Sequence, residues 1–252
     1  MTMPVSETPA LQVQDITVCF GGMMALNHVS LEVQNGARHG ILGPNGAGKT
    51  TMFNVITGFI APDAGRVVIR GVDATRMAAH RRVGLGLART FQITTLFPAL
   101  TALENVMMGT LSRIHHHRNV WRPARKDREA RDLAKGLLDD LGLGSFADAP
   151  VGEIGYGQQR QLEIALALSA DPDILLLDEP TAGLSAVETQ AVCALVERLR
   201  PELTIVIIEH DLDVIFGLAN VITVLHQGDK IAEGPADEVK EDPVVKEVYL
   251  GG

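Results

Sequence analysis

A glycine-rich segment in the first fifth of the chain has the residue types and spacing needed to hold phosphate groups. Residues 43–50 match the pattern G-x-x-x-x-G-K-[ST]. Glycines let a backbone curl so that successive N–H groups point inward at phosphate oxygens. Lys49 supplies a cation for the β- and γ-phosphates, and the hydroxyl of Thr50 is a ligand for Mg²⁺. The segment predicts binding of ATP with Mg²⁺. The predicted contact residues are Gly43, Pro44, Asn45, Gly46, Ala47, Gly48, Lys49, Thr50 and Thr51.

Two adjacent carboxylates form a second candidate element for nucleotide chemistry. Asp178 and Glu179 follow the apolar run 174–177. Asp178 is expected to hold Mg²⁺ through water, and Glu179 to polarise the water that attacks a phosphate. Acidic residues often end strands without any such role. The functional interpretation therefore depends on the phosphate-binding segment in the same chain.

Strands and helices must place both motifs. The stretch 38–42 predicts a strand that runs into the glycine-rich segment, and 49–57 predicts a helix with Gly58 as its C-cap. The apolar runs 174–177 and 204–208 are typical of strands buried on both faces of a parallel sheet. Between these runs, a helix is predicted, and one of its faces is marked by Leu184, Val187, Ala191, Leu195 and Leu199.

The remaining segments divide into three kinds. Alternating apolar residues over 11–33, with a short strand at 67–70, predict an antiparallel sheet. Helical periodicity dominates 101–170, with one helix from Pro123 to Leu141 and another from about Gly157 to Ala170. A strand pair with a turn at 227–228 is expected over 221–232. We expect a flexible tail over 1–10 and a single domain over 11–252, with a helical subdomain inserted at about 95–170.

The two motifs and their surroundings resemble those of ATP-binding cassette (ABC) ATPases, over nearly the whole chain. The resemblance implies an α/β fold: a P-loop NTPase core with an N-terminal antiparallel β-subdomain and an inserted α-helical subdomain. Gln92 matches the family's Q-loop, which contacts Mg²⁺ and the attacking water. His210 matches the histidine that contacts the γ-phosphate, and Phe20 lies where the family stacks an aromatic ring on adenine. Taken singly, these three residues are more often a loop amide, an ordinary histidine and a core aromatic.

The family's signature segment is present in altered form. The chain has Ile154-Gly-Tyr-Gly-Gln where the family has Leu-Ser-Gly-Gly-Gln. The resemblance implies that Gly155, Gly157 and Gln158 approach the γ-phosphate held by the other subunit of a head-to-tail dimer. Gly155 lacks the serine hydroxyl, and a lost hydrogen bond to a charged group costs about 1.5–3 kcal/mol. Ser185 stands where the family often has an aspartate in the D-loop, which puts communication across the dimer in doubt at that point.

Several stretches resemble the importer ATPases for branched-chain amino acids, in which this tyrosine-containing signature is familiar. They are 20–26, 43–54, 89–92, 156–160, 179–184 and 248–251. The resemblance implies an ATP-hydrolysing subunit that powers an importer. Its partners would be a second ABC ATPase subunit, transmembrane permease subunits and, indirectly, a periplasmic or extracellular solute-binding protein. A groove near Gln92 to Leu103 would receive the permease.

Composition limits the location and the partners. The formal net charge of −9 argues against nucleic acid as a partner, because phosphate backbones are held mainly by Lys and Arg. No apolar run approaches the roughly 20 residues of a membrane span. We therefore expect a peripheral protein at the cytoplasmic face of the inner (plasma) membrane that is soluble when isolated. The tract 115–117 (His-His-His) and the charged run 122–131 are more simply solvated faces than a metal site or a nucleic-acid patch.

Two other functions share the same ATP chemistry. One is the ATPase of a different ABC transporter, such as a lipid exporter, which would differ only in its membrane-facing loops. The other is a soluble ABC ATPase of DNA repair, translation or iron–sulfur assembly. The chain has neither sustained heptads nor a second cassette, and both absences count against this last class.

Overall fold

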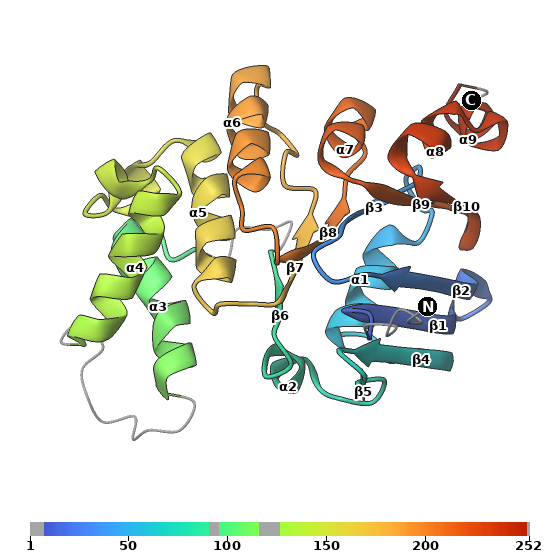
Figure 1. Cartoon of the computed structure of the whole chain (residues 1–252), viewed down its shortest axis with the longest axis horizontal. Helices are drawn as coiled ribbons and strands as arrows, with labels where there is room; N and C mark the ends of the chain where they lie inside the picture. Colours follow the sequence, from blue (N-terminus) through green and yellow to red (C-terminus); the bar gives the residue numbers. More distant parts are fainter. Residues whose placement is uncertain (1–7, 91–95, 116–126, 251–252) are drawn as a thin grey trace, which may run out of the picture.

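The computed structural model describes residues 8–90, 96–115 and 127–250, and in these ranges a six-stranded sheet forms the centre of the molecule (Figure 1). Its strand order is β10-β9-β3-β8-β7-β6. The strands are β3 (Arg38–Leu42), β6 (Leu87–Arg89), β7 (Ile174–Asp178), β8 (Thr204–Ile208), β9 (Val221–His226) and β10 (Asp229–Pro235). All neighbours pair in parallel except β10, which runs antiparallel to β9.

The predicted strands of this sheet are confirmed closely. β3 and β8 have the predicted bounds, and β7 extends one residue further, to Asp178. Every residue of β7 and β8 is buried, as continuous apolar runs require when helices cover both faces. The C-terminal strand pair is also confirmed, with its turn at Gln227 and Gly228, both at positive φ.

A four-stranded antiparallel sheet lies beside the central one, among the described residues (Figure 1). Its order is β2-β1-β4-β5, from β1 (Leu11–Phe20), β2 (Met23–Val33), β4 (Ala64–Ile69) and β5 (Val72–Asp73). The strand predicted at 67–70 starts earlier, at Ala64, and ends at Ile69. Helix α1 (Lys49–Thr57) lies between the sheets, ends at Gly58 as predicted, and shares one apolar core with both. Of the predicted tail, residues 1–7 lie outside the described part, and Ala10 is buried.

A separate group of helices lies to the left of the central sheet, beyond its β6 edge (Figure 1). They are α3 (Ala102–His115), α4 (Arg128–Asp140) and α5 (Tyr156–Leu168), and they share their own apolar cluster. The inserted helical region is therefore confirmed. The predicted helix start at Pro123 lies outside the described residues. The described part of that helix begins after Asp127, whose side chain accepts a hydrogen bond from the N–H of Ala130 at 3.1 Å.

Helix α6 (Ala186–Glu197) buries only part of the predicted face, which is confirmed at Leu195 and, just after the helix, at Leu199. Val187 is 77% exposed and Ala191 is exposed, whereas Val192, Leu195 and Val196 are buried. Within α6, Val192 is the first buried residue that belongs to the neighbouring apolar cluster. An apolar pattern leads to burial only where another element covers it, and the first turns of α6 lack that cover.

Short helices complete the described fold. Helix α2 (Ala79–Val83) precedes β6, while α7 (Leu212–Leu218), α8 (Ala236–Glu241) and α9 (Pro243–Leu250) pack near β9 and β10 (Figure 1). In the described ranges, no helix is both long and apolar enough to cross a membrane.

Candidate functional site

The glycine-rich segment joins the end of β3 to the start of α1, so it lies at the carboxyl edge of the parallel strands. A side chain at Gly43 would place its Cβ 2.3 Å from the carbonyl oxygen of Leu225 on β9, so only glycine fits there. Gly46 has a φ of 81°, which other residues adopt with strain. The N-terminus of α1 follows the loop directly, so its first N–H groups and the positive end of its dipole favour an anion bound in the loop.

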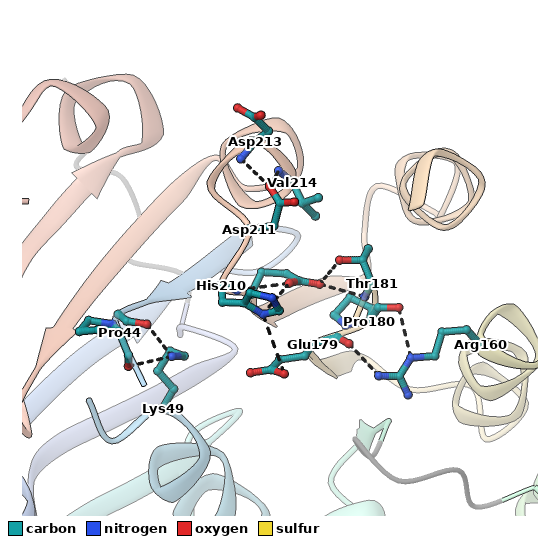
Figure 2. Close-up of polar contacts among 12 residues, drawn as sticks. Pro44, Lys49, Arg160, Glu179, Pro180, Thr181, His210, Asp211, Asp213 and Val214 are labelled. Atoms are coloured by element: carbon teal, nitrogen blue, oxygen red, sulfur yellow. Dashed lines mark hydrogen bonds and ion pairs between the residues drawn. The ribbon is translucent and has the colours of Figure 1, made fainter. Parts of the chain in front are cut away.

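The amino group of Lys49 lies beside Pro44, near the start of the loop (Figure 2). Its Nζ donates to the carbonyl oxygens of Gly43 at 2.5 Å and Pro44 at 3.1 Å. Burial lowers the pKa of Lys49, and the negative charges of Glu179 and Asp178 partly oppose that shift. Both predicted acidic residues are therefore close enough to act electrostatically on the loop lysine.

The structure brings Phe20, most of the loop and Glu179 around one hollow of about 250 Å³. Its lining consists of Phe20, Met23, Met24, Ala25, the loop residues Asn45, Gly46, Ala47, Gly48, Lys49, Thr50 and Thr51, and Glu179. Phe20 is 47% exposed at the end of β1, so its ring is available to a ligand. An aromatic side chain, the glycine-rich loop and a carboxylate thus surround the same space.

Asp178 ends β7 and has a partner that the sequence did not indicate. Its Oδ2 accepts a hydrogen bond from the guanidinium of Arg89 at 2.6 Å, and both side chains are almost fully buried. Arg89 ends β6, the neighbouring strand in the sheet. Its place in the Arg-Thr-Phe-Gln segment was the only available sequence signal, and it does not indicate a partner.

Glu179 has an unusual backbone conformation. Its φ of 47° lies in the left-handed region, which costs a non-glycine residue about 1–3 kcal/mol. Arg160 of α5 donates to the carbonyl oxygens of Glu179 at 2.7 Å and Pro180 at 3.2 Å (Figure 2). It also pairs with Glu163 at 2.6 Å. The Glu179 N–H bonds to the carbonyl oxygen of Ile208 at 2.9 Å. These contacts hold the turn in place.

His210 lies beside Glu179 in space, although 31 positions separate them in the chain (Figure 2). Its Nδ1 is 3.9 Å from Oε2 of Glu179, and 57% of its side chain is exposed. Glu209, which the sequence reasoning did not consider, is fully buried and accepts hydrogen bonds from the N–H and hydroxyl of Thr181 at 2.9 and 2.7 Å. Glu209 directly precedes His210 in the chain, so its hydrogen bonds to Thr181 connect the His210 segment to the turn after Glu179.

The altered signature segment begins α5, with Gly155 as its N-cap. The N–H of Gly157 donates to Oε1 of Glu188 at 3.2 Å. The other oxygen of Glu188 accepts from the N–H and hydroxyl of Ser185 at 2.9 and 2.7 Å. Ser185 therefore has a structural role as the N-cap of α6, in a complete capping box with Glu188. Gly155, Gly157 and Gln158 are absent from the lining of the hollow at the phosphate loop.

A second hollow, of about 520 Å³, lies between residues of α2 and β6 on one side and residues of α5 on the other. It is mainly apolar, and its lining includes Phe59, Val83, Leu166, Ala167 and Arg89. None of the described residues 96–103 lines this hollow, and residues 92–95 of the predicted groove lie outside the described part of the chain. Gln92 lies outside the described residues.

The oxygen chemistry of the site fits Mg²⁺. In the part of the chain that the structure describes, no cluster of three or more His, Cys, Asp and Glu side chains could hold a metal alone. Mg²⁺ typically binds one or two protein oxygen ligands together with substrate phosphates. Thr50 at the loop and Asp178 provide such oxygens, and the carboxylate of Asp178 acts on Lys49. His116 and His117 lie outside the described residues.

Comparison with known proteins gives consistent matches. The family model for ABC transporters matches residues 26–182, and one for branched-chain amino acid ATP-binding cassette transporters matches 230–252. The branched-chain amino acid transport ATP-binding protein BraF of Pseudomonas aeruginosa is 39% identical, over 96% of this chain and 98% of BraF. LivG of Escherichia coli, with the same described role, is 36% identical over 96% of this chain and 98% of LivG.

Solved structures agree in fold. The ADP conformation of MJ1267, an ATP-binding cassette of an ABC transporter, has a TM-score of 0.85 and 32% identity, with 100% of both chains covered. The dimeric structure of the bacterial cassette MJ0796 has a TM-score of 0.76 and 28% identity, covering 90% of this chain and 98% of that chain.

Proposed function

The chain belongs to the ABC transporter family, and from this premise we propose that it is the ATP-binding and ATP-hydrolysing subunit of an importer for branched-chain or related amino acids. The observation that carries the ATPase part is the hollow where Phe20, the phosphate loop and Glu179 meet. The amino-acid part is supported by the named roles of BraF and LivG and by the family match over 230–252.

ATP would bind with its adenine against Phe20 and its phosphates inside the loop. Aromatic rings stack favourably on flat ligands, and Phe20 is exposed for such a contact. The loop N–H groups and the start of α1 would receive the phosphate oxygens. Lys49 would exchange the carbonyl oxygens of Gly43 and Pro44 for the β- and γ-phosphates.

Thr50, Asp178 and Gln92 would hold Mg²⁺ together with the phosphates, with Asp178 acting through water. The bound ion neutralises the negative charge that develops on the phosphate oxygens during hydrolysis. Asp178 is suited to this task because its other oxygen, Oδ2, is already fixed by Arg89.

Glu179 would polarise the attacking water, whose oxygen bonds to the γ-phosphorus as the bridging bond to the β-phosphate breaks. The products are ADP and inorganic phosphate. His210, beside Glu179, would contact the γ-phosphate, and Gln92 would help to place the water. The backbone contacts from Arg160 keep the strained Glu179 turn in one conformation.

The active unit would be a head-to-tail dimer with a second ABC ATPase subunit, either the same chain or a different one. Gly155, Gly157 and Gln158 would face the γ-phosphate of the partner's site, which agrees with their absence from the hollow in their own chain. The dimeric MJ0796 cassette supports this arrangement by its similar fold.

The dimer would lie at the cytoplasmic face of the membrane, bound to permease subunits that receive solute from a binding protein. The apolar hollow beside Phe59 and Leu166 is our proposed docking place for the permease. Apolar, partly enclosed surfaces of this kind favour protein contacts.

Affinity purification of the tagged chain from native membranes tests the transport role. We expect it to co-purify with permease subunits and a second ATPase, and the complex to hydrolyse ATP faster with binding protein loaded with leucine, isoleucine or valine. An ATPase that responds to ribosomes or DNA, with no permease recovered, would contradict the proposal.

A further inference from the structure

We propose that Arg89 is a positioning residue that fixes the metal-binding carboxylate of Asp178, a role that rests on the proposed ATP-binding function. The first argument is the contact itself. One arm of the guanidinium donates to Oδ2 of Asp178 at 2.6 Å, and the two side chains are only 7% and 3% exposed. Charge-assisted hydrogen bonds of this kind are strong and directional.

The second argument is that Arg89 is itself held in place. Its other arm donates to Oδ1 of Asn54 at 2.7 Å and to Oγ1 of Thr57 at 3.2 Å, both on α1. Its guanidinium also lies over the ring of Phe53, 5.5 Å from the ring centre. Several contacts in different directions leave the guanidinium little freedom, so it can act as a fixed support.

The third argument is the position of Arg89 between the two halves of the nucleotide site. Helix α1 starts at the phosphate loop, and β7 ends at Asp178. Arg89 bonds to the last turns of α1 and to the end of β7, so it fixes the metal side of the site relative to the phosphate side. The bond occupies Oδ2 of Asp178 and leaves Oδ1 to receive the water of a metal ion.

Arg89 would therefore act on Mg²⁺ affinity and leave the binding of ATP alone unchanged. Groups that hydrogen-bond to a metal ligand raise metal affinity by about 10–100-fold. A lysine cannot replace Arg89 fully, because a single ammonium group lacks the planar fork that reaches Asp178 and Asn54 together.

The test measures ATP binding by the full-length chain, first in EDTA and then in a titration with Mg²⁺. The variants are Arg89→Gln and Arg89→Lys. The matched control is Arg70→Gln, because Arg70 also pairs with an aspartate, Asp173, but both side chains are half-exposed at the surface. Thermal unfolding of each variant is recorded alongside.

We expect Arg89→Gln to bind ATP in EDTA within about twofold of wild type and to need about 10–100-fold more Mg²⁺ for the half-maximal effect. Arg89→Lys should need about 10-fold more, and Arg70→Gln should match wild type. In an Asp178→Asn background, adding Arg89→Gln should cause no further shift, because Arg89 acts through that carboxylate.

An Mg²⁺ titration of Arg89→Gln that matches wild type would overturn the inference, as would an unreduced shift in the Asp178→Asn background. If Arg89→Gln does not fold, Arg89→Lys decides in the same way. A wild-type chain that binds no ATP under either condition would instead overturn the proposed function, and that failure is visible before any variant is measured.

Discussion

Arg160 donates a hydrogen bond to the carbonyl oxygen of Glu179 at 2.7 Å (Figure 2). Arg160 lies on α5, the helix that begins with the signature segment, and Glu179 is the proposed catalytic residue of the same chain. The signature is proposed to serve the partner's nucleotide, whereas Glu179 serves its own. In the proposed dimer, this one side chain would connect elements of two different ATP sites.

The buried pair of Arg160 and Glu163 predicts a large stability effect when only one partner is removed. Arg160→Met should lower the free energy of unfolding by about 3–5 kcal/mol, because Glu163 would keep a buried charge without its partner. The measurement is urea unfolding. Arg113→Met, at an exposed pair with Asp171, is the control and should cost less than about 1 kcal/mol. Equal effects at both positions would be evidence against this account of the buried pair.

Two glycines of the phosphate loop should respond differently to alanine. In Gly43→Ala, the new Cβ would lie 2.3 Å from the backbone oxygen of Leu225, so the loop must move. The affinity for ATP should therefore fall at least 10-fold. Gly46→Ala has open space around its Cβ and should add only left-handed strain of about 1–2 kcal/mol. ATP binding and thermal unfolding of both variants test this order, which a greater loss at Gly46 would reverse.

The capping role of Ser185 predicts how substitutions at this position of the D-loop change the free energy of unfolding. Ser185→Ala removes the N-cap of α6 and should cost about 0.5–2 kcal/mol of stability. Ser185→Asp, which restores the residue common in the family, keeps an N-cap acceptor but loses the hydroxyl donor to Glu188 and places two carboxylates together, so it should recover only part of the stability lost in Ser185→Ala. Chemical denaturation compares the three proteins. A loss in Ser185→Asp as large as in Ser185→Ala would show that the cap is not what matters.

His39 predicts a dependence of stability on pH. Burial lowers its pKa from 6.5 to about 4, and its Nε2 lies 2.8 Å from the hydroxyl of Thr223. The unfolded chain takes up the proton near pH 6.5 and the folded chain only near pH 4. The stability from this residue is thus complete above pH 6.5 and falls by about 3 kcal/mol between pH 6.5 and pH 4.

The variant His39→Gln isolates that contribution. Its free energy of unfolding should decrease less steeply than that of wild type across this pH range, because glutamine does not titrate. Unfolding curves at pH 7, 6, 5 and 4 provide the comparison. Parallel pH profiles for the two proteins would mean that His39 is not the group responsible.

The parts predicted well from the sequence are those with a repeating or local pattern. The bounds of β3, α1 and β8 follow from apolar runs and from the glycines around the phosphate loop. The partners of the site residues could not be predicted in this way. Arg89 and Asp178 are separated by 89 positions, and a single arginine in a short strand carries no pattern that identifies its partner.

The predicted face of α6 was only partly right, for a related reason: Leu195 and Leu199 are buried, but Val187 and Ala191 are exposed. Its apolar residues continue past the point where the core cluster covers them, so Val187 is exposed despite fitting the stripe. The strained backbone at Glu179 could not be predicted from the sequence either, because Arg160 of α5, a different element, holds its carbonyl oxygen. Tertiary contacts decide both features, and local sequence preference does not. The roles of all the site residues, including Gln92 and the signature residues, remain predictions.

The most direct measurement of the central claim compares ATP binding with ATP hydrolysis in Glu179→Gln, within the complex purified from membranes. Glu197→Gln, at an exposed glutamate of α6, is the matched control. We predict that Glu179→Gln binds ATP as wild type does but hydrolyses it about 10²–10⁴-fold more slowly, while Glu197→Gln keeps both properties. Hydrolysis by Glu179→Gln at the wild-type rate would contradict the assignment of this site as the ATPase centre.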